Sequence, residues 1–243
     1  MTIKFFQPPT QEAAPNLSPF CTKLDMMLQL SGLEFTREMA MDPREGPKQK
    51  VPFIEDDKGR LGDTQFIEAH LKSAYNVDLL RELSPHDAAL GRMIMGTVEE
   101  QLYFIIVYSR WQIETNWPIM EEIFFGHMPP EPRSEIAPQA LEMMRNALRG
   151  QGIGRHSEEE VFALGARIID DLATLLGDNT YFFGDTPTSV DASVYGGLIN
   201  LFGNPVPTPL AAHIKSHRNL SAYLDRISAK YFANAARATA QAA

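Results

Sequence analysis

The amino-acid sequence predicts an α+β N-terminal domain over residues 1–77, followed by an all-α C-terminal domain over residues 85–243. Three observations support this division. Strand-like and helix-like patterns alternate up to Tyr75, no convincing strand follows it, and residues 83–87 form a linker that leads into a helix start. Hydrophobic residues make up 44% of the 243 residues and charged residues 22%, so the chain can bury a substantial core.

The N-terminal part begins with a short buried strand at residues 3–6, which a polar, proline-rich loop follows. Ser18 and Pro19 predict a helix start, because serine is a favoured N-cap and proline fits the first helical position. Apolar residues at helical spacing continue this helix as far as Gly32. Residues 35–41 are the candidate for a second strand.

Residues 51–54 and 60–61 predict a β-hairpin, because they flank a glycine-containing turn at residues 57–59. Asp63 and Thr64 precede an amphipathic helical stretch that completes this part of the chain. The predicted order is therefore β-α-β-loop-β-β-α, which is the arrangement of thioredoxin.

Helix signals alone describe the C-terminal part. A long helix is predicted from residue 87 to about residue 115, and a proline-rich break follows at residues 128–132. Ser157 and Thr188 each begin a capping box, in which a hydroxyl and a carboxylate three residues later satisfy free N–H groups. The alanine-rich end, residues 233–243, predicts a helix or a fraying tail.

Composition excludes several classes of function. The formal net charge of −9 argues against nucleic acid and anionic membrane surfaces as partners, since both attract basic proteins. No run of about eighteen apolar residues predicts a membrane span, and the N-terminus lacks the features of a secretion signal. Cys21 is the only cysteine, so we expect a reducing, cytoplasmic location.

Segments in both parts together resemble the glutathione S-transferase superfamily. The N-terminal ones are residues 18–24 (SPFCTKL) and residues 50–54 (KVPFI) with Asp63 and Thr64, and the C-terminal one is residues 183–192 (FGDTPTSVDA). A further segment, residues 151–160 (QGIGRHSEEE), resembles the branch that contains the failed-axon-connections and metaxin-like proteins. The resemblance implies the glutathione-transferase fold, with a thioredoxin-like domain that binds glutathione as co-substrate.

The resemblance also implies a glutathione site. Pro52 would be a cis-proline that presents the backbone of Val51 to the cysteinyl part of glutathione; a trans proline at a sheet edge is the alternative. Thr64, at a helix start, would bind the γ-glutamyl carboxylate, and Asp63 the ammonium group, although both residues also fit a simple N-cap. Lys50 would pair with the glycyl carboxylate or remain a solvated lysine.

Ser18 is the candidate catalytic residue. A hydroxyl donor and a helix N-terminus both favour a thiolate, and Ser18 would supply the first while it occupies the second. The alternative is that Ser18 only caps the helix. Cys21 is expected to be a small buried residue; the competing hypothesis is an acidic thiol that forms a mixed disulfide with glutathione.

Aromatic residues on the long helix of the C-terminal part are candidates for the electrophile pocket. Tyr103, Tyr108 and Trp111 would line it, although packing in the core explains such residues equally well. His213 and His217 have i,i+4 spacing, but without a recognisable third ligand we expect surface histidines and no metal site. The glycine-rich residues 150–154 are read as a turn between helices.

The leading functional hypothesis is a glutathione transferase that conjugates the thiolate of glutathione to a small apolar electrophile. A non-catalytic binding or scaffold protein that kept the fold is the alternative, and a thiol reductase that acts through Cys21 is a third. The resemblance also implies a homodimer.

Overall fold

The computed structural model describes residues 2–8, 15–40 and 42–233. Its N-terminal part contains one four-stranded sheet with the strand order β2-β1-β3-β4. The strands are β1 (Ile3–Gln7), β2 (Phe35–Met39), β3 (Phe53–Asp56) and β4 (Gly59–Gly62). β2 is parallel to β1, whereas β3 is antiparallel to both β1 and β4. The predicted thioredoxin-like order is confirmed.

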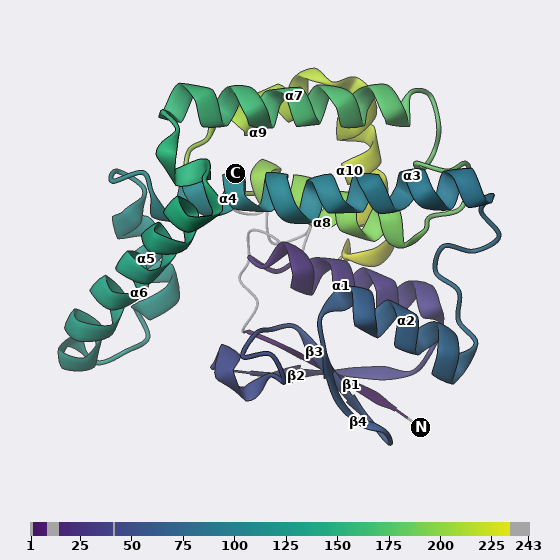
Figure 1. Cartoon of the computed structure of the whole chain (residues 1–243), viewed down its shortest axis with the longest axis horizontal. Coiled ribbons are helices and arrows are strands. Elements are labelled where there is room, and N and C mark those ends of the chain that lie inside the picture. Colours follow the sequence, from purple (N-terminus) through teal and green to yellow (C-terminus); the bar gives the residue numbers. More distant parts are fainter. Residues whose placement is uncertain (1, 9–14, 41, 234–243) are drawn as a thin grey trace.

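Two helices lie on the face of the sheet that is turned toward the helical domain (Figure 1). They are α1 (Pro19–Ser31) and α2 (Thr64–Tyr75). Ser18 caps α1 with Pro19 in its first turn, and Gly32 ends it in the left-handed conformation with φ 70°. The start and end signals of α1 were therefore both read correctly from the sequence.

The C-terminal part is all-helical within the described residues. Its helices are α3 (Pro85–Gly96), α4 (Tyr103–Trp111), α5 (Trp117–Phe125), α6 (Pro130–Gln151), α7 (Glu158–Leu176), α8 (Ser189–Phe202), α9 (Pro209–Ser216) and α10 (Arg218–Tyr231). The predicted long helix corresponds to α3 and α4, which are joined by a π-helical segment, Thr97–Leu102. α5 and α6 project together away from the other helices (Figure 1).

The capping boxes form as predicted. At the start of α8, the buried carboxylate of Asp191 accepts hydrogen bonds from the N–H groups of Phe182 and Thr188, at 3.0 and 2.7 Å. Ser157 makes the equivalent box at the start of α7. The turn predicted at residues 150–154 is confirmed only in part: Gly150 and Gln151 still belong to α6, and the connection to α7 begins at Gly152.

The two parts of the chain meet along α1 and α8, and Gly196 permits the close approach. A Cβ atom at Gly196 would lie 2.5 Å from the carbonyl oxygen of Pro19, which is too short for a real contact. The backbone of α1 therefore sits directly on α8, and this contact fixes the position of Ser18 relative to the helical part.

Two sequence expectations need a further remark. The alanine-rich end from residue 234 onward lies outside the described residues. Among the described helices, none combines the length and apolar character needed to span a bilayer.

Candidate active site

Ser18 lies at the N-terminus of α1 with its side chain half-buried. Its hydroxyl oxygen accepts a hydrogen bond from the N–H of Cys21 at 3.3 Å, so the residue is the helix cap that the sequence predicts. Its side chain also hydrogen-bonds the Cys21 thiol and lowers the pKa of that thiol, so the hydroxyl proton would turn from Cys21 to a bound thiolate. Capping and donation to a thiolate are thus compatible in one side chain.

The segment before Ser18 is held by side chains from three elements. Asn16 accepts from the N–H of Ser18 at 2.8 Å, and its amide donates to Gln7 at the end of β1 at 3.0 Å. The carbonyl of Asn16 accepts from the Asn200 amide of α8 at 3.1 Å and from the hydroxyl of Thr22 at 3.2 Å. Ser18 is therefore fixed from both parts of the chain.

Arg110 of α4 adds a buried positive charge to this arrangement. Its guanidinium donates to the Leu17 carbonyl at 2.6 Å, to Asn200 at 3.0 and 3.1 Å, and to Asn204 at 3.1 Å. Within the described residues, all of these acceptors are uncharged oxygens and no carboxylate forms an ion pair with it. Burial lowers the pKa of Arg110 to about 10. Because the guanidinium contacts the carbonyl of Leu17, the residue before Ser18, its positive charge favours an anion bound near Ser18.

Val51 and Pro52 are joined by a cis peptide bond, as predicted. The sheet pairing on both sides of β3 ends at Phe53, so Val51 lies just beyond the paired strands. Its backbone is therefore placed where an extended peptide can continue the sheet.

Asp63 and Thr64 begin α2, and the structure separates their roles. Asp63 is exposed and accepts from the N–H of Gln65 at 3.0 Å, with φ at 81°, a region that residues other than glycine rarely adopt. Thr64 is only 4% exposed. Its hydroxyl oxygen accepts a hydrogen bond from the ammonium of Lys23 at 3.0 Å. A ligand carboxylate therefore reaches the Thr64 hydroxyl less easily than the sequence suggests, because this hydroxyl is buried and already paired with Lys23.

Lys23 is the centre of a buried network between the two parts of the chain. Its ammonium lies 2.5 Å from the carboxylate of Glu99, in the π-helical segment, and both side chains are almost fully buried. Glu99 also accepts from Ser193 of α8 at 2.8 Å and from Gln65 at 3.3 Å. The start of α2 is therefore tied to the helical part through ionised groups.

The lysines near the predicted site are exposed. Lys50, next to Val51, makes no side-chain hydrogen bond or ion pair with the described residues and remains a candidate for the glycyl carboxylate. Lys48 lies closer to the start of α2, with its ammonium 3.9 Å from the Asp63 carboxylate and 4.0 Å from the ring centre of Phe66. Lys48 therefore lies beside Asp63 at the start of α2.

Cys21 is completely buried. Burial raises the pKa of its thiol to about 12, although the hydrogen bond with Ser18 acts in the opposite direction. A thiol that is neither exposed nor ionised cannot attack a disulfide at neutral pH. The hypothesis of a reactive Cys21 is therefore wrong, and the expectation of a small buried residue is confirmed.

The three aromatic residues predicted for the electrophile pocket face different neighbours. Tyr103 packs edge-to-face on Phe20, beside the start of α1, with ring centres 4.9 Å apart. Trp111 stacks on Phe124 of α5 at 5.3 Å. Tyr108 is buried, and burial raises the pKa of its hydroxyl. Among the described residues, the ring of Tyr103 contacts the first turn of α1 and the ring of Trp111 contacts α5, so these two rings have different neighbours.

A cavity of about 400 Å³ lies at the end of α4, and Ser18 is not among its lining residues. Its lining residues come from the α4–α5 connection, α5, the start of α7 and the loop before α9. They include Ile113, Asn116, Ile119, Phe162 and Pro207. Trp111 precedes the lining residue Ile113 by two positions in the sequence. An apolar ligand in this cavity would therefore contact Ile119 of α5 and Phe162 of α7 rather than Tyr103.

His213 and His217 are partly exposed on α9, as the sequence predicts. A carboxylate that their spacing does not predict lies beside both rings. Asp170 of α7 accepts from both imidazole rings, at 2.7 and 2.8 Å. Sequence spacing cannot reveal this contact, because 43 residues separate Asp170 from His213.

Sequence reasoning missed Lys23, Glu99 and Arg110. One signal was present for Arg110, which is the lone charged residue between Glu100 and Glu114 in an otherwise apolar helix. Lys23 and Glu99 are 76 residues apart, and neither position alone indicates an ion pair. Buried charges of this kind become visible only once the helices are packed together.

Comparison with known proteins gives two family matches in the same order along the chain. Residues 19–117 match the glutathione S-transferase N-terminal domain, and residues 165–227 match the glutathione S-transferase C-terminal domain. Among solved structures, the β-etherase LigF from Sphingobium sp. strain SYK-6 is similar, with a TM-score of 0.68 and 18% identity over 98% of this chain and 99% of LigF. A glutathione S-transferase of Methylobacterium radiotolerans in complex with glutathione sulfonate has a TM-score of 0.59 and 18% identity, over 97% of this chain and 94% of that one.

Relatives by sequence show the same family. An isoprene-epoxide glutathione S-transferase of Rhodococcus sp. strain AD45 is 30% identical over 89% of this chain and 94% of its own length. Failed axon connections of Drosophila melanogaster is 25% identical over 90% of this chain, and metaxin-1 of Macaca fascicularis is 28% identical over 79%. The chain spans only 55% and 63% of the lengths of these last two relatives. With both domains matched in order and a relative at this identity aligned almost end to end, the chain belongs to the glutathione S-transferase family, as the resemblance of its motifs indicates.

Proposed function

We propose that this protein is a glutathione transferase in which Ser18 activates the thiol of glutathione for attack on a small apolar electrophile. The observation that carries this proposal is the placement of Ser18: a half-buried hydroxyl at a helix N-terminus, next to Leu17, whose carbonyl accepts a hydrogen bond from the buried Arg110. Each of these features lowers the free energy of a bound thiolate relative to the thiol.

Glutathione is the proposed co-substrate. Val51, which precedes β3 by two residues, is placed to pair with the cysteinyl backbone of glutathione. The exposed Asp63 is placed to pair with its ammonium group. The electrophile would enter beside Tyr103 and Phe20, which pack together next to Ser18. The relative from Rhodococcus, whose name gives isoprene epoxide as its electrophile, supports a small apolar epoxide as the first compound to test.

The chemistry would proceed in one bond-forming step. The thiol of glutathione loses its proton to solvent, and the thiolate, held by the Ser18 hydroxyl, attacks an electrophilic carbon of the epoxide. The carbon–sulfur bond forms as the carbon–oxygen bond breaks, and the resulting alkoxide takes a proton from water. The protein contributes stabilisation of the thiolate and proximity of the two reactants.

A non-catalytic binding protein is the alternative function, and one observation favours it. The hydroxyl of Thr64, which the family resemblance assigns to the γ-glutamyl carboxylate, is buried against Lys23. Failed axon connections and metaxin-1, which are also similar to this chain, keep this alternative open.

The test compares Ser18→Ala with Ser84→Ala. Both serines cap a helix, but Ser84 is exposed at the start of α3. Loss of a hydrogen bond to a charged group costs about 1.5–3 kcal/mol, so kcat/KM of Ser18→Ala should fall about 10- to 150-fold. Its pH profile should move to higher pH, whereas Ser84→Ala should match the wild type.

Thermal unfolding separates the two candidate functions. Addition of ~10 mM glutathione should raise the Tm of the wild type, because the ligand binds only the folded state. S-methylglutathione, whose sulfur cannot ionise, should give a smaller rise. If neither compound raises the Tm, the transferase proposal fails and the binding-protein alternative stands. A rise without turnover of any epoxide would identify a glutathione-binding protein that is not a transferase.

A further inference from the structure

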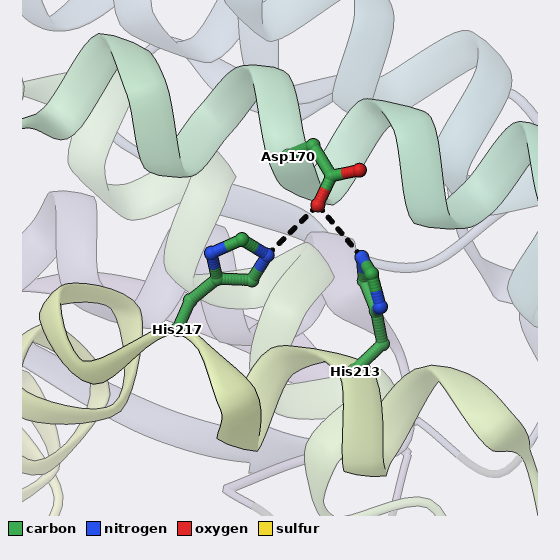
Figure 2. Close-up of side chains that lie close together, drawn as sticks. All are labelled: Asp170, His213 and His217. Carbon is green, nitrogen blue, oxygen red and sulfur yellow. Dashed lines mark hydrogen bonds and ion pairs between the residues drawn. The ribbon is translucent and has the colours of Figure 1, made fainter.

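The cluster formed by Asp170, His213 and His217 is not used by the proposed thiol chemistry. Asp170 projects from α7 and the two histidines from the end of α9, and all three side chains converge on one point (Figure 2). The Nε2 atoms of both rings lie 2.7 and 2.8 Å from the same oxygen of Asp170. The ligand atoms of the three residues all lie within 4.8 Å of one another.

The fold fixes this cluster from both sides. On one side α9 packs tightly on α7, since a Cβ atom at Gly165 would lie 2.6 Å from the side chain of Leu210. On the other side the amide of Asn219 donates to the carbonyls of Ala173 and Gly177, at 2.8 and 3.1 Å, near the end of α7. The distance between the carboxylate and the imidazoles is thus set by helix packing rather than by the cluster itself.

The chemistry of these groups matches a transition metal. Two imidazole nitrogens and one carboxylate oxygen are ligands that Zn²⁺ accepts at about 2.0–2.2 Å, and a water molecule can complete a tetrahedron. Mg²⁺ and Ca²⁺ prefer oxygen ligands throughout, so they fit less well. His213 lies in the last turn of α9 and His217 is the residue that caps its end, and both direct Nε2 to the same oxygen of Asp170.

Metal binding requires the ligand atoms to rearrange: the two imidazole–carboxylate distances must widen, and the two imidazole nitrogens, which lie within 4.8 Å of each other, must end about 3.3 Å apart. Ligand atoms around a tetrahedral zinc ion lie about 3.3 Å apart when the bonds are about 2.0 Å long. The two imidazole–carboxylate distances are 2.7 and 2.8 Å, so each must widen by roughly half an ångström as the ion replaces the two shared protons. The side chains of His213, His217 and Asp170 are 33%, 27% and 52% exposed, which leaves room for this movement and for a water ligand.

We infer that Asp170, His213 and His217 form a binding site for a divalent transition metal, with Zn²⁺ as the best match, that links α7 to α9. These helices lie on the side of the helical domain that faces away from the sheet (Figure 1). The metal therefore acts on the stability of the helical domain and takes no part in the chemistry at Ser18. A metal that binds only the folded chain stabilises it by mass action.

The experiment is a calorimetric titration of the untagged full-length chain with ZnCl₂, beside a titration with MgCl₂. We expect saturable binding of one Zn²⁺ per chain and no Mg²⁺ binding, with a rise in Tm only for Zn²⁺. Co²⁺ should give the visible absorption bands of a tetrahedral site. Absence of one-to-one Zn²⁺ binding to the wild type would overturn the inference and leave the cluster as a hydrogen-bonded ion pair.

Variants locate the site. Asp170→Asn, His213→Ala and His217→Ala should each weaken Zn²⁺ binding at least tenfold and abolish the Co²⁺ bands. His156→Ala is the matched control, because His156 also faces a carboxylate, Glu160, at 3.4 Å, but has no second histidine in that pair. Equal loss in the control, or full binding in all three variants, would place the metal elsewhere. Catalysis with glutathione is measured separately, so failure of one proposal does not imply failure of the other.

Discussion

At the scale of single residues, burial decides which of the polar groups near α1 can react. Ser18 and Cys21 are three residues apart on the first turn, yet Ser18 is half-buried and Cys21 is completely buried. The sequence places both at a helix N-terminus and so suggests activation of either one. The structure distinguishes them, because only Ser18 is reachable by a ligand.

The single cysteine makes this distinction measurable. Because Cys21 is buried and its thiol has a pKa raised to about 12 by burial, we expect no reaction with an aromatic disulfide reagent at pH 8 while the protein is folded. Unfolding in urea should release one reactive thiol per chain, and Cys21→Ser should release none. Rapid labelling of the folded wild type would contradict this account and return a thiol-dependent activity to consideration.

What the sequence reveals about the site depends on how local each residue's role is. Neighbouring residues predicted Ser18 and Asp63 as helix caps, and the family resemblance implied the cis bond before Pro52; all three features are present in the structure. The burial of Thr64 was not predicted, because it depends on Lys23 reaching it from another helix. Local signals identify the site, and packing decides how each group in it is used.

At the scale of elements, start and end signals predicted most helices. Irregular features inside two of the helices were not predicted. The helix predicted from residue 87 to about residue 115 contains a π-helical segment that changes its register. α6 continues through Pro138, although proline lacks the N–H that an α-helix needs at that position. Periodicity cannot show either feature, since neither one interrupts the apolar pattern enough to be seen.

Two glycine substitutions test the contact between α1 and α8. Gly196→Ala should destabilise the protein by about 1–3 kcal/mol, because its Cβ atom would meet the backbone of Pro19 at 2.5 Å. Gly96→Ala, in a helical backbone with no atom within 4 Å of the new Cβ, should be stabilising by about 0.4–1 kcal/mol. Urea unfolding measures both. Similar free energies of unfolding for the two variants would show that α1 and α8 can separate without cost.

At the scale of the whole molecule, ionised groups as well as apolar packing hold the two parts of the chain together. Lys23 belongs to the thioredoxin-like part and Glu99 to the helical part, and their side chains meet where both parts exclude water. The fold class and the order of the two parts were predicted from the sequence. This ionic connection was not, since each charge appears in the sequence as one polar residue among apolar neighbours.

Removal of either charge should be costly. Lys23→Met and Glu99→Leu should each destabilise the protein by about 3–5 kcal/mol, because each leaves the other charge buried without a partner. The double variant should be more stable than the sum of the single effects predicts, as a double-mutant cycle will show. The exposed pair Lys72 and Asp78, 2.7 Å apart, is the control, and its removal should cost about 0–1 kcal/mol. Additive effects at Lys23 and Glu99 would contradict a coupled pair.

The pairing of Lys23 with Glu99 also limits how the gene for this protein can recombine. The thioredoxin-like half carries an ammonium group that water cannot reach and that only the other half neutralises. Joining this half to the helical half of a relative without a carboxylate at the position of Glu99 would bury an unbalanced charge in the chimera. Exchange of one half alone is therefore expected to destabilise the chimera, although each half resembles a separate domain.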